Sequence, residues 1–299
     1  MGDGGRLGWG VLGAANIARR AVLEAIAASR NGRIVAMASR DPRRAREMLA
    51  PYPEARVVES YEALLADPHV DVVYNPLPNS LHLPWTLRAL EAGKHVLCEK
   101  PIGLNAREAE EMAAAASASG KHVMEAFMYR FHPAVRELVA RSRNAIHVEA
   151  SFGFKLRDRG DIRLNAKLGG GALLDVGCYT VSFARWILGE PDYVVARSTM
   201  GNGVDVTTSA LLHFPNGSTA AVWCSVAAAE VQELMVVTPD EVLRRTRAFN
   251  ARHDPDDPYR LMVESFADSV MHDRPVEIPI SESIANMRVL DRIAEAARS

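Results

Sequence analysis

Residues 7–18 read LGWGVLGAANIA, a short apolar run followed at once by a turn of small residues and the start of a helical stretch. A dinucleotide-binding turn has the pattern Gly, any, Gly, any, any, Gly or Ala between a strand and a helix. Gly13 and Ala18 match its first and last positions, whereas Ala15 replaces the middle glycine, which lets the backbone approach a pyrophosphate. The alternative is an ordinary strand–turn–helix joint. We favour the binding turn and expect cofactor contacts from Gly13, Ala15, Asn16 and Ile17.

The pattern of this first segment continues over the first 125 residues. Apolar, β-branched runs such as Arg33–Ser39 and Val70–Tyr74 alternate with helical stretches such as Leu81–Ala92 and Ala106–Ser119. Strands that alternate with helices predict a doubly wound parallel sheet. We therefore assign residues 1–125 to an α/β domain with the Rossmann dinucleotide-binding fold.

After residue 125 the strands become longer and follow one another directly. Pro215-Asn216-Gly217 predicts a hairpin turn between two of them, because Asn-Gly tolerates the positive φ angles of tight turns. Short turns between consecutive strands predict a mostly antiparallel, open sheet. We assign residues 126–299 to an α+β domain for substrate binding and oligomerisation. Helices that would cover one face of its sheet are expected at Gly177–Leu188, Tyr259–His272 and Ser281–Ala297.

Composition argues against several other classes of protein. The formal net charge is -2 and the basic residues are scattered, so there is no electrostatic footprint for nucleic acid. The longest apolar runs are far shorter than the roughly 20 residues of a membrane span, and the amino terminus lacks the apolar core of a secretory signal. Cys98, Cys178 and Cys224 fit neither a disulfide framework nor a zinc site. We expect a cytoplasmic protein with no metal, nucleic-acid or membrane partner.

The end of the second expected strand bears on the choice between NAD and NADP. NAD enzymes usually place an acidic side chain there for the ribose hydroxyl, whereas NADP enzymes offer arginine to the 2′-phosphate. Asp41 precedes Pro42, and aspartate followed by proline is typical of a helix start. We interpret Asp41 as a helix cap and expect Ser39 and Arg40 to bind the phosphate of NADP. NAD stays possible, because the alternative for Arg40 is a solvated surface side chain.

Two later strands are followed by unusual polar segments. Residues 74–82 read YNPLPNSLH and residues 98–101 read CEKP. Lys100 comes directly after a predicted parallel strand, at the sheet edge where α/β proteins bind ligands. Taken alone, Lys100 is equally well explained by a surface ion pair with Glu99.

Three motifs in order resemble those of the Gfo/Idh/MocA family of oxidoreductases, which includes glucose–fructose oxidoreductase and inositol dehydrogenase. They are the triplet Glu99-Lys100-Pro101, the joining segment EAFMYRFHP at 125–133, and GGGALLDVGCY at 169–179. The resemblance runs from about residue 7 to the end. It is nearest to NADP-dependent D-xylose dehydrogenases, dihydrodiol dehydrogenases and glucose–fructose oxidoreductase.

The resemblance implies hydride transfer between NADP(H) and a hydroxyl or carbonyl carbon of a sugar, sugar derivative or polyol. Lys100 matches the catalytic lysine, Asp175 the acidic residue that binds substrate hydroxyls, and Tyr179 stands where most members have histidine. Loss of hydride from a carbinol requires an acid/base for its proton, and a nearby Lys100 would stabilise the phenolate of Tyr179. We expect cofactor contacts from Pro76, Leu77, Asn79, His82, Glu99 and Lys100, and substrate contacts from Arg130, Arg163, Asp175 and Tyr179.

Other interpretations stay open at this point. The chain could be a non-catalytic nucleotide-binding regulator of the same fold, or a Rossmann protein for another cofactor such as a methyl donor. We also expect a homodimer or higher homo-oligomer, formed by the apolar residues Ala210, Leu212, Phe214, Ala221 and Trp223 of the second sheet. The interval from Thr238 to Asp256 is shorter than in the family, and we expect it to be helical or irregular around residues 243–247.

Overall fold

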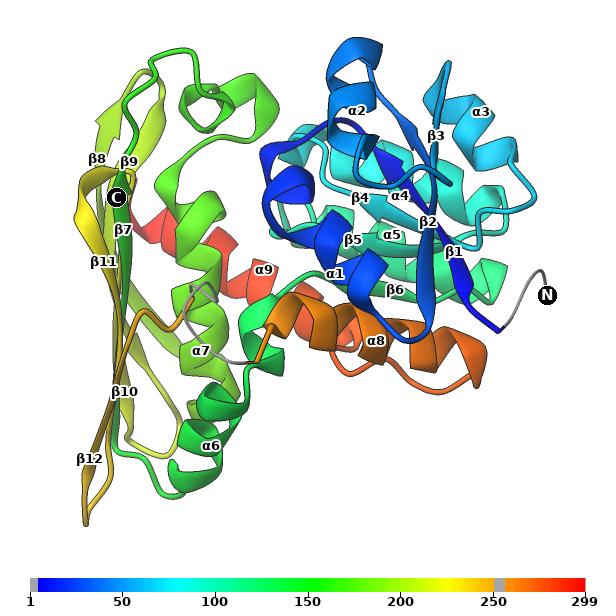
Figure 1. Cartoon of the computed structure of the whole chain (residues 1–299). Helices are drawn as coiled ribbons and strands as arrows, with labels where there is room; N and C mark the ends of the chain where they lie inside the picture. The colour runs from blue at the N-terminus through cyan, green and yellow to red at the C-terminus, as the bar shows by residue number, and fades with distance from the viewer. Residues whose placement is uncertain (1–4, 250–255, 299) are drawn as a thin grey trace. The chain divides into compact units, whose positions relative to one another are not determined.

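The computed structural model describes residues 5–249 and 256–298, so part of the interval after Val237 lies outside the described residues. Contacts divide the chain into two compact units, which Figure 1 shows. The first comprises described residues up to Ile102, Glu108–Met128 and Asp257–Ser283. The second comprises Gly103–Arg107 and the described residues of Tyr129–Asp256 and Ile284–Ser299. Each unit is built around its own six-stranded sheet.

The first sheet is parallel throughout, with the strand order β3-β2-β1-β4-β5-β6. This order is that of the dinucleotide-binding Rossmann fold, as predicted. The strands are β1 (Leu7–Leu12), β2 (Gly32–Ala38), β3 (Arg56–Val58), β4 (Val72–Asn75), β5 (His95–Cys98) and β6 (Val123–Glu125). Strand β1 is buried from Gly8 to Leu12, because helices cover both faces of such a sheet.

The helices of this unit follow the predicted alternation. They are α1 (Leu23–Ala28), α2 (Pro42–Leu49), α3 (Tyr61–Ala66), α4 (His82–Glu91), most of α5 (Ala106–Ser119) and α8 (Pro258–Met271). The helical stretch that follows the first turn contains a π-helical turn, η1 (Ala18–Val22), immediately before α1.

Helix α8 corrects one expectation about packing. The sequence-based prediction placed the helix at Tyr259–His272 on the second sheet, whereas α8 packs beside α1 and β2 of the first unit (Figure 1). The side chain of Asn31 donates to the Glu264 carbonyl and to Asp268, over 2.9 and 2.8 Å. The rings of Trp9 and Phe266 meet edge to face, with centroids 6.1 Å apart. A carboxyl-terminal segment thus completes the amino-terminal core.

The second sheet is mixed and mostly antiparallel, with the strand order β12-β11-β7-β10-β9-β8 and one parallel pair, β7 with β10. Its strands are β7 (His147–Lys155), β8 (Tyr193–Gly201), β9 (Val204–His213), β10 (Thr219–Ser225), β11 (Ala227–Val237) and β12 (Val242–Thr246). Strand β12 corrects the expectation of a helical or irregular segment near residue 243. It pairs with β11, and register places Leu243 opposite Val236.

Helices cover one face of the second sheet. They are α6 (Pro133–Arg141) and the π-helical turn η6 (Leu173–Gly177) with α7 (Cys178–Leu188), whereas α9 (Ile280–Ala296) contacts α7, since Asn286 donates to the Cys178 carbonyl at 3.2 Å. Of these, η6 and α7 pack on β7 and β10. Ala210, Leu212 and Phe214 are buried, so they do not belong to the outward face. That face instead carries Val195 and Leu211, which are 47% and 50% exposed and pair across β8 and β9.

Candidate active site

The expected cofactor residues of the first unit gather at the carboxyl edge of the parallel sheet. Gly13 directly follows β1 and has a φ of +81°, a conformation that favours glycine. A Cβ at this position would lie 2.8 Å from Cδ2 of Leu77, which follows β4. Between β1 and β4 the strand order reverses, and open α/β sheets bind ligands at that point. Ala15 and Ile17 are half-buried in the same turn.

The turn after β2 has the geometry expected from Asp41. Its Oδ1 accepts the N–H of Arg44 at 3.0 Å, and Pro42 is the first residue of α2, so Asp41 is a helix cap as predicted. Ser39 accepts the N–H of Asp41 over 3.1 Å. Arg40 is exposed, and its charge opposes the rise that burial causes in the pKa of Tyr61. The two expected phosphate-binding residues therefore stand side by side at the strand end.

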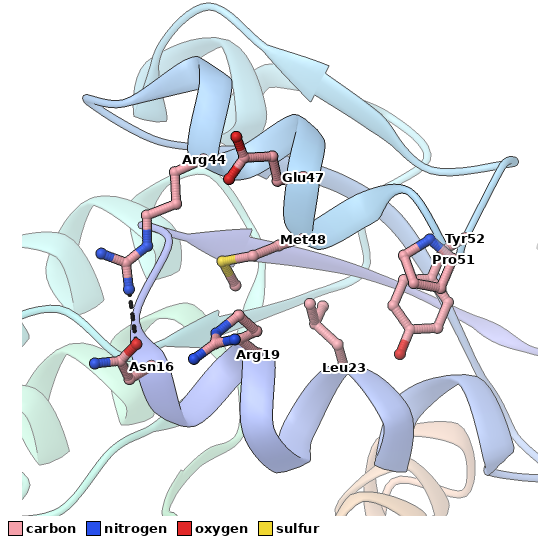
Figure 2. Close-up of a pocket in the computed structure, with 8 residues that line it drawn as sticks. All are labelled: Asn16, Arg19, Leu23, Arg44, Glu47, Met48, Pro51 and Tyr52. Carbon is pink, nitrogen blue, oxygen red and sulfur yellow. Dashed lines mark hydrogen bonds between the residues drawn. The ribbon is translucent and has the colours of Figure 1, made fainter.

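A cavity of about 600 Å³ opens next to this turn, between the start of the first helix and α2 (Figure 2). Arg44 donates from Nη2 to Oδ1 of Asn16 over 2.8 Å, and Arg19 points into the same space. Sequence reasoning missed Arg44 and Arg19. A signal existed, because a cation in the first turn of α2 opposes the helix dipole and is unfavourable without an anion nearby. The remaining lining residues are Leu23, Glu47, Met48, Pro51 and Tyr52.

His82 links the two loops that carry the other expected cofactor residues. Its ring nitrogens lie 2.8 Å from the carbonyl oxygens of Pro101 and Leu77, and its side chain is 0% exposed. Burial lowers its pKa to about 4, against the effect of the two carbonyls. His82 is an internal link, and any influence on a cofactor would pass through these loops. Asn79 begins the short helix before α4 and is half-buried, whereas Pro76 is buried.

The triplet Glu99-Lys100-Pro101 follows β5, and the buried side chain of Tyr74 fixes its first residue. The hydroxyl of Tyr74 donates to Oε1 of Glu99 over 2.7 Å, and Glu99 is buried. Oε2 of Glu99 accepts the N–H of Lys100 at 3.3 Å. One carboxylate thus fixes the backbone at Lys100, whose side chain is half-buried at the carboxyl edge of the sheet.

In the second unit the structure brings together two of the expected substrate residues. Nε of Arg163 lies 2.9 Å from Oδ2 of Asp175, whose side chain is 13% exposed. Arg163 also pairs with Asp161 at 3.1 Å. The Asp175 carboxylate, followed by the Asp161 carboxylate, raises the pKa of Arg163. Asp175 lies in η6, and the guanidinium of Arg163 holds one oxygen of its carboxylate. This arrangement can orient the carboxylate toward hydroxyl groups of a substrate.

Tyr179, one turn further along the same helix, lies in an aromatic cluster. Its ring centroid is 5.2–5.6 Å from those of Tyr129, Phe152 and Phe249, and the residue is 7% exposed. Such contacts fix the ring, so the direction of its hydroxyl is determined by packing. The guanidinium of Arg130 lies 4.5 Å from the ring centroid of Trp186, a separate set of contacts from the Arg163–Asp175 pair.

The described ranges, 5–249 and 256–298, contain no group of three or more His, Cys, Asp or Glu residues arranged to hold a metal ion. None of their helices combines the length and apolar character needed to cross a membrane.

Comparisons with known proteins agree with this geometry. Residues 7–127 match the oxidoreductase family with an NAD-binding Rossmann fold, and residues 134–242 match the GFO/IDH/MocA C-terminal domain. D-xylose 1-dehydrogenase (NADP(+)) 2 of Haloferax volcanii is 39% identical over 97% of both chains. Trans-1,2-dihydrobenzene-1,2-diol dehydrogenase of Mus musculus is 38% identical over 74% of this chain and 69% of its own.

Among solved structures, the 3-ketoreductase KijD10 from Actinomadura kijaniata, in complex with NADP and TDP-benzene, superposes with a TM-score of 0.89. It is 31% identical, and the match covers 97% of this chain and 98% of that one. Family matches to both halves of the chain, together with the full-length relative, lead to one assignment. The chain belongs to the GFO/IDH/MocA family of NAD(P)-dependent oxidoreductases.

Proposed function

We propose that this protein transfers a hydride between NADP(H) and a hydroxyl or carbonyl carbon of a sugar, sugar derivative or polyol. The observation that carries the cofactor choice is the group of cations at the end of β2. Arg40 follows the strand, and Arg44 and Arg19 line the neighbouring cavity beside Asn16. Asp41 is engaged as a helix cap, so this strand end offers positive rather than negative charge to the adenosine ribose.

The residues of the first unit fit a dinucleotide. Gly13 has a positive φ and a Cβ there would collide with Leu77, so the absence of a side chain keeps the turn in a shape in which its backbone can approach a pyrophosphate. Ser39, Arg40 and Arg44 would hold the 2′-phosphate through charge-assisted hydrogen bonds. When bound, the nicotinamide ring would supply the hydride acceptor or donor.

The proton side of the reaction belongs to Lys100 and Tyr179. When a carbinol carbon gives up its hydride, the hydroxyl proton must pass to a base, for which we assign the phenolate of Tyr179, which becomes a phenol. The Lys100 ammonium would stabilise this phenolate before the proton arrives, and Asp175 and Arg163 would hold neighbouring substrate hydroxyls. In the reductive direction the same phenol returns the proton to the alkoxide. These assignments draw on the family motifs and on the fixed settings of Asp175 and Tyr179.

A panel of substrates tests the proposed function. Purified protein is mixed with aldoses, ketosugars, inositols and a trans-diol, each with NADP+ or NAD+, and reduced nicotinamide is followed by absorbance. We expect turnover of at least one sugar or polyol, with a higher kcat/KM for NADP+ than for NAD+. Turnover of no substrate in either direction would contradict the proposal, and equal use of both cofactors would contradict the NADP assignment.

We further propose that the outward face of the second sheet joins two copies of the chain. One rung of this face runs Val195, Leu211, Ala221, Glu149 and Met235, and four of its five members are apolar. The exposed apolar side chains support an interface. Sedimentation velocity at micromolar concentration is expected to show a dimer, and Leu211→Lys to convert it to monomer. A monomeric wild-type protein would contradict the proposal.

A further inference from the structure

A half-buried carboxylate on β9, that of Asp205, lies against the start of the helix that carries Asp175 and Tyr179. Oδ2 of Asp205 accepts the N–H of Leu173 at 2.7 Å and the hydroxyl of Thr208 at 2.9 Å. The Leu173 amide belongs to the first turn of a helix, where N–H groups lack partners within the helix and require an acceptor. Asp205, more than 30 residues away in the sequence, supplies it.

The turn before this helix has room for the Asp205 carboxylate only because residue 171 is a glycine. Gly171 has a φ of +121°, and a Cβ there would lie 2.2 Å from Oδ1 of Asp205. No side chain larger than hydrogen fits between the turn and the carboxylate. On its other side the same turn is bound to the loop of Arg163, whose carbonyl accepts the N–H of Gly171 at 2.9 Å. The helix start is therefore held from two directions, by Asp205 and by the residue that pairs with Asp175.

An irregularity in the sheet directs Asp205 to this position. In β9 the inward residues are Thr208, Ala210 and Leu212, so regular alternation would turn Asp205 to the outward face. The register with β8 shifts between Thr199, which pairs with Thr207, and Met200, which pairs with Asp205. One extra residue in β9 thus returns Asp205 to the inward side. Bulges of this kind re-aim side chains and are frequent beside active sites.

A hydroxyl chain fixes the carboxylate in turn. Since the Thr208 hydroxyl donates to Asp205, its oxygen accepts from the Ser198 hydroxyl of β8 at 2.7 Å. Burial raises the pKa of Asp205, and the hydrogen bonds from Leu173, Thr208 and Ala172 oppose that rise. Three strand residues, Asp205, Thr208 and Ser198, therefore hold the amide of Leu173 where this helix begins.

We infer that Asp205 is a positioning residue for the reaction, which sets the place of Asp175 and Tyr179 by anchoring the helix that carries both. This inference rests on the proposed function, because it assigns a role to the support of the proposed substrate and proton-transfer residues. Asp205 acts through the amide of Leu173 and the close approach of Gly171. Its carboxylate has no direct role in the chemistry.

The experiment combines kinetics with hydrogen–deuterium exchange of residues 169–178. Asp205→Ala is compared with Asp240→Ala, a matched control because Asp240 is exposed in the turn between β11 and β12. For Asp205→Ala we expect at least tenfold faster exchange of this segment and a kcat lower by about 10²-fold, the effect of misplacing reacting groups by about 1 Å. The KM for NADP+ stays unchanged, since the proposed cofactor residues belong to the first unit. Asp240→Ala behaves as wild type in all three measurements.

Two milder variants keep the test decisive if Asp205→Ala fails to fold. Asp205→Asn retains one acceptor oxygen and should recover part of both kcat and exchange protection. Thr208→Val should show a smaller effect in the same direction. A normal kcat in folded Asp205 variants, or a lowered kcat without faster exchange, would overturn the inference. If wild-type protein turns over no substrate, the proposed function and the positioning role both fail, whereas the exchange data still decide whether Asp205 anchors the helix.

Discussion

The two units hold their functional side chains in different ways. In the first unit, Gly13, Arg40 and Lys100 each follow a strand of one parallel sheet, and the order of the strands brings them to a common edge. In the second unit, Asp175 and Tyr179 share one helix, whose start is fixed by side chains from other segments, Arg163 and Asp205. The positions of the candidate site residues are therefore set mainly by strand order in the first unit and by individual side-chain contacts in the second.

This difference has a practical meaning for substitutions. A parallel sheet with buried strands is stabilised by many small contributions, so the loss of one loop contact leaves the sheet edge in place. A helix start held by a few hydrogen bonds can shift when one partner is removed, because buried donors without acceptors are costly. We therefore expect distant substitutions to affect catalysis more often in the second unit.

The largest expected effect tests whether both units contribute to one reaction. Lys100→Met and Tyr179→Phe should each lower kcat by about 10²- to 10⁴-fold, the usual contribution of acid–base assistance. Affinity for NADPH, measured by fluorescence quenching, should change little. If the two side chains act as a unit, the double variant should lose little more than the worse single variant. Near wild-type turnover by Lys100→Met would contradict a common role of Lys100 and Tyr179 in the reaction.

The next effect concerns acid stability of the first unit. The pKa of His82 is about 4 in the folded protein, below the 6.5 of an unfolded chain. Its contribution is complete above pH 6.5 and is lost as pH falls toward 4, because only the unfolded chain then binds a proton. The loss amounts to about 3 kcal/mol. Urea unfolding is measured at several pH values from 7 to 4, with amide exchange as the readout. As the pH falls, the amides of β4 and β5 should lose protection at lower urea concentrations than those of β9 and β10.

His82→Gln should remove this pH dependence, since glutamine does not titrate in this range. His69→Gln is the matched control, because His69 is exposed in the same unit. An identical acid slope in wild type and His82→Gln would assign the pH dependence to other groups.

The smallest expected effect concerns the contribution of Arg44 to cofactor binding. Arg44→Ala should weaken NADPH binding by roughly 10- to 150-fold, the value of one charge-assisted hydrogen bond, and leave NADH binding nearly unchanged. Arg43→Ala is a suitable control, since Arg43 is exposed and pairs with Glu47 at 3.5 Å. Equal losses for NADPH and NADH would indicate that Arg44 supports the fold of the turn.

Those features that depend on neighbouring residues were predictable from the sequence. The parallel sheet and the cap at Asp41 follow from local patterns, and both are found. Features set by partners far along the chain were not. Strand β12 carries Arg244 and Arg245 and shows its character only through pairing with β11. Helix α8 is amphipathic in either unit, and its sequence does not specify which apolar surface it covers.

Asp205 shows the same limit at the candidate site. Strand alternation assigns it to the outward face, and only the register shift opposite Met200 reverses that assignment. A register shift depends on two strands, so neither strand reveals it alone.

The extra residue in β9 also has an evolutionary consequence. Deleting Val206 would restore regular pairing with β8 and still leave Asp205 opposite Met200 on the inward side, whereas losing the bulge at unchanged strand length would turn Asp205 toward solvent. Inheritance of this support therefore depends on bulge and strand length changing together, as well as on amino-acid identity. Among related chains, a β9 of the same length without the bulge would mark lineages that must stabilise the glycine turn by other means.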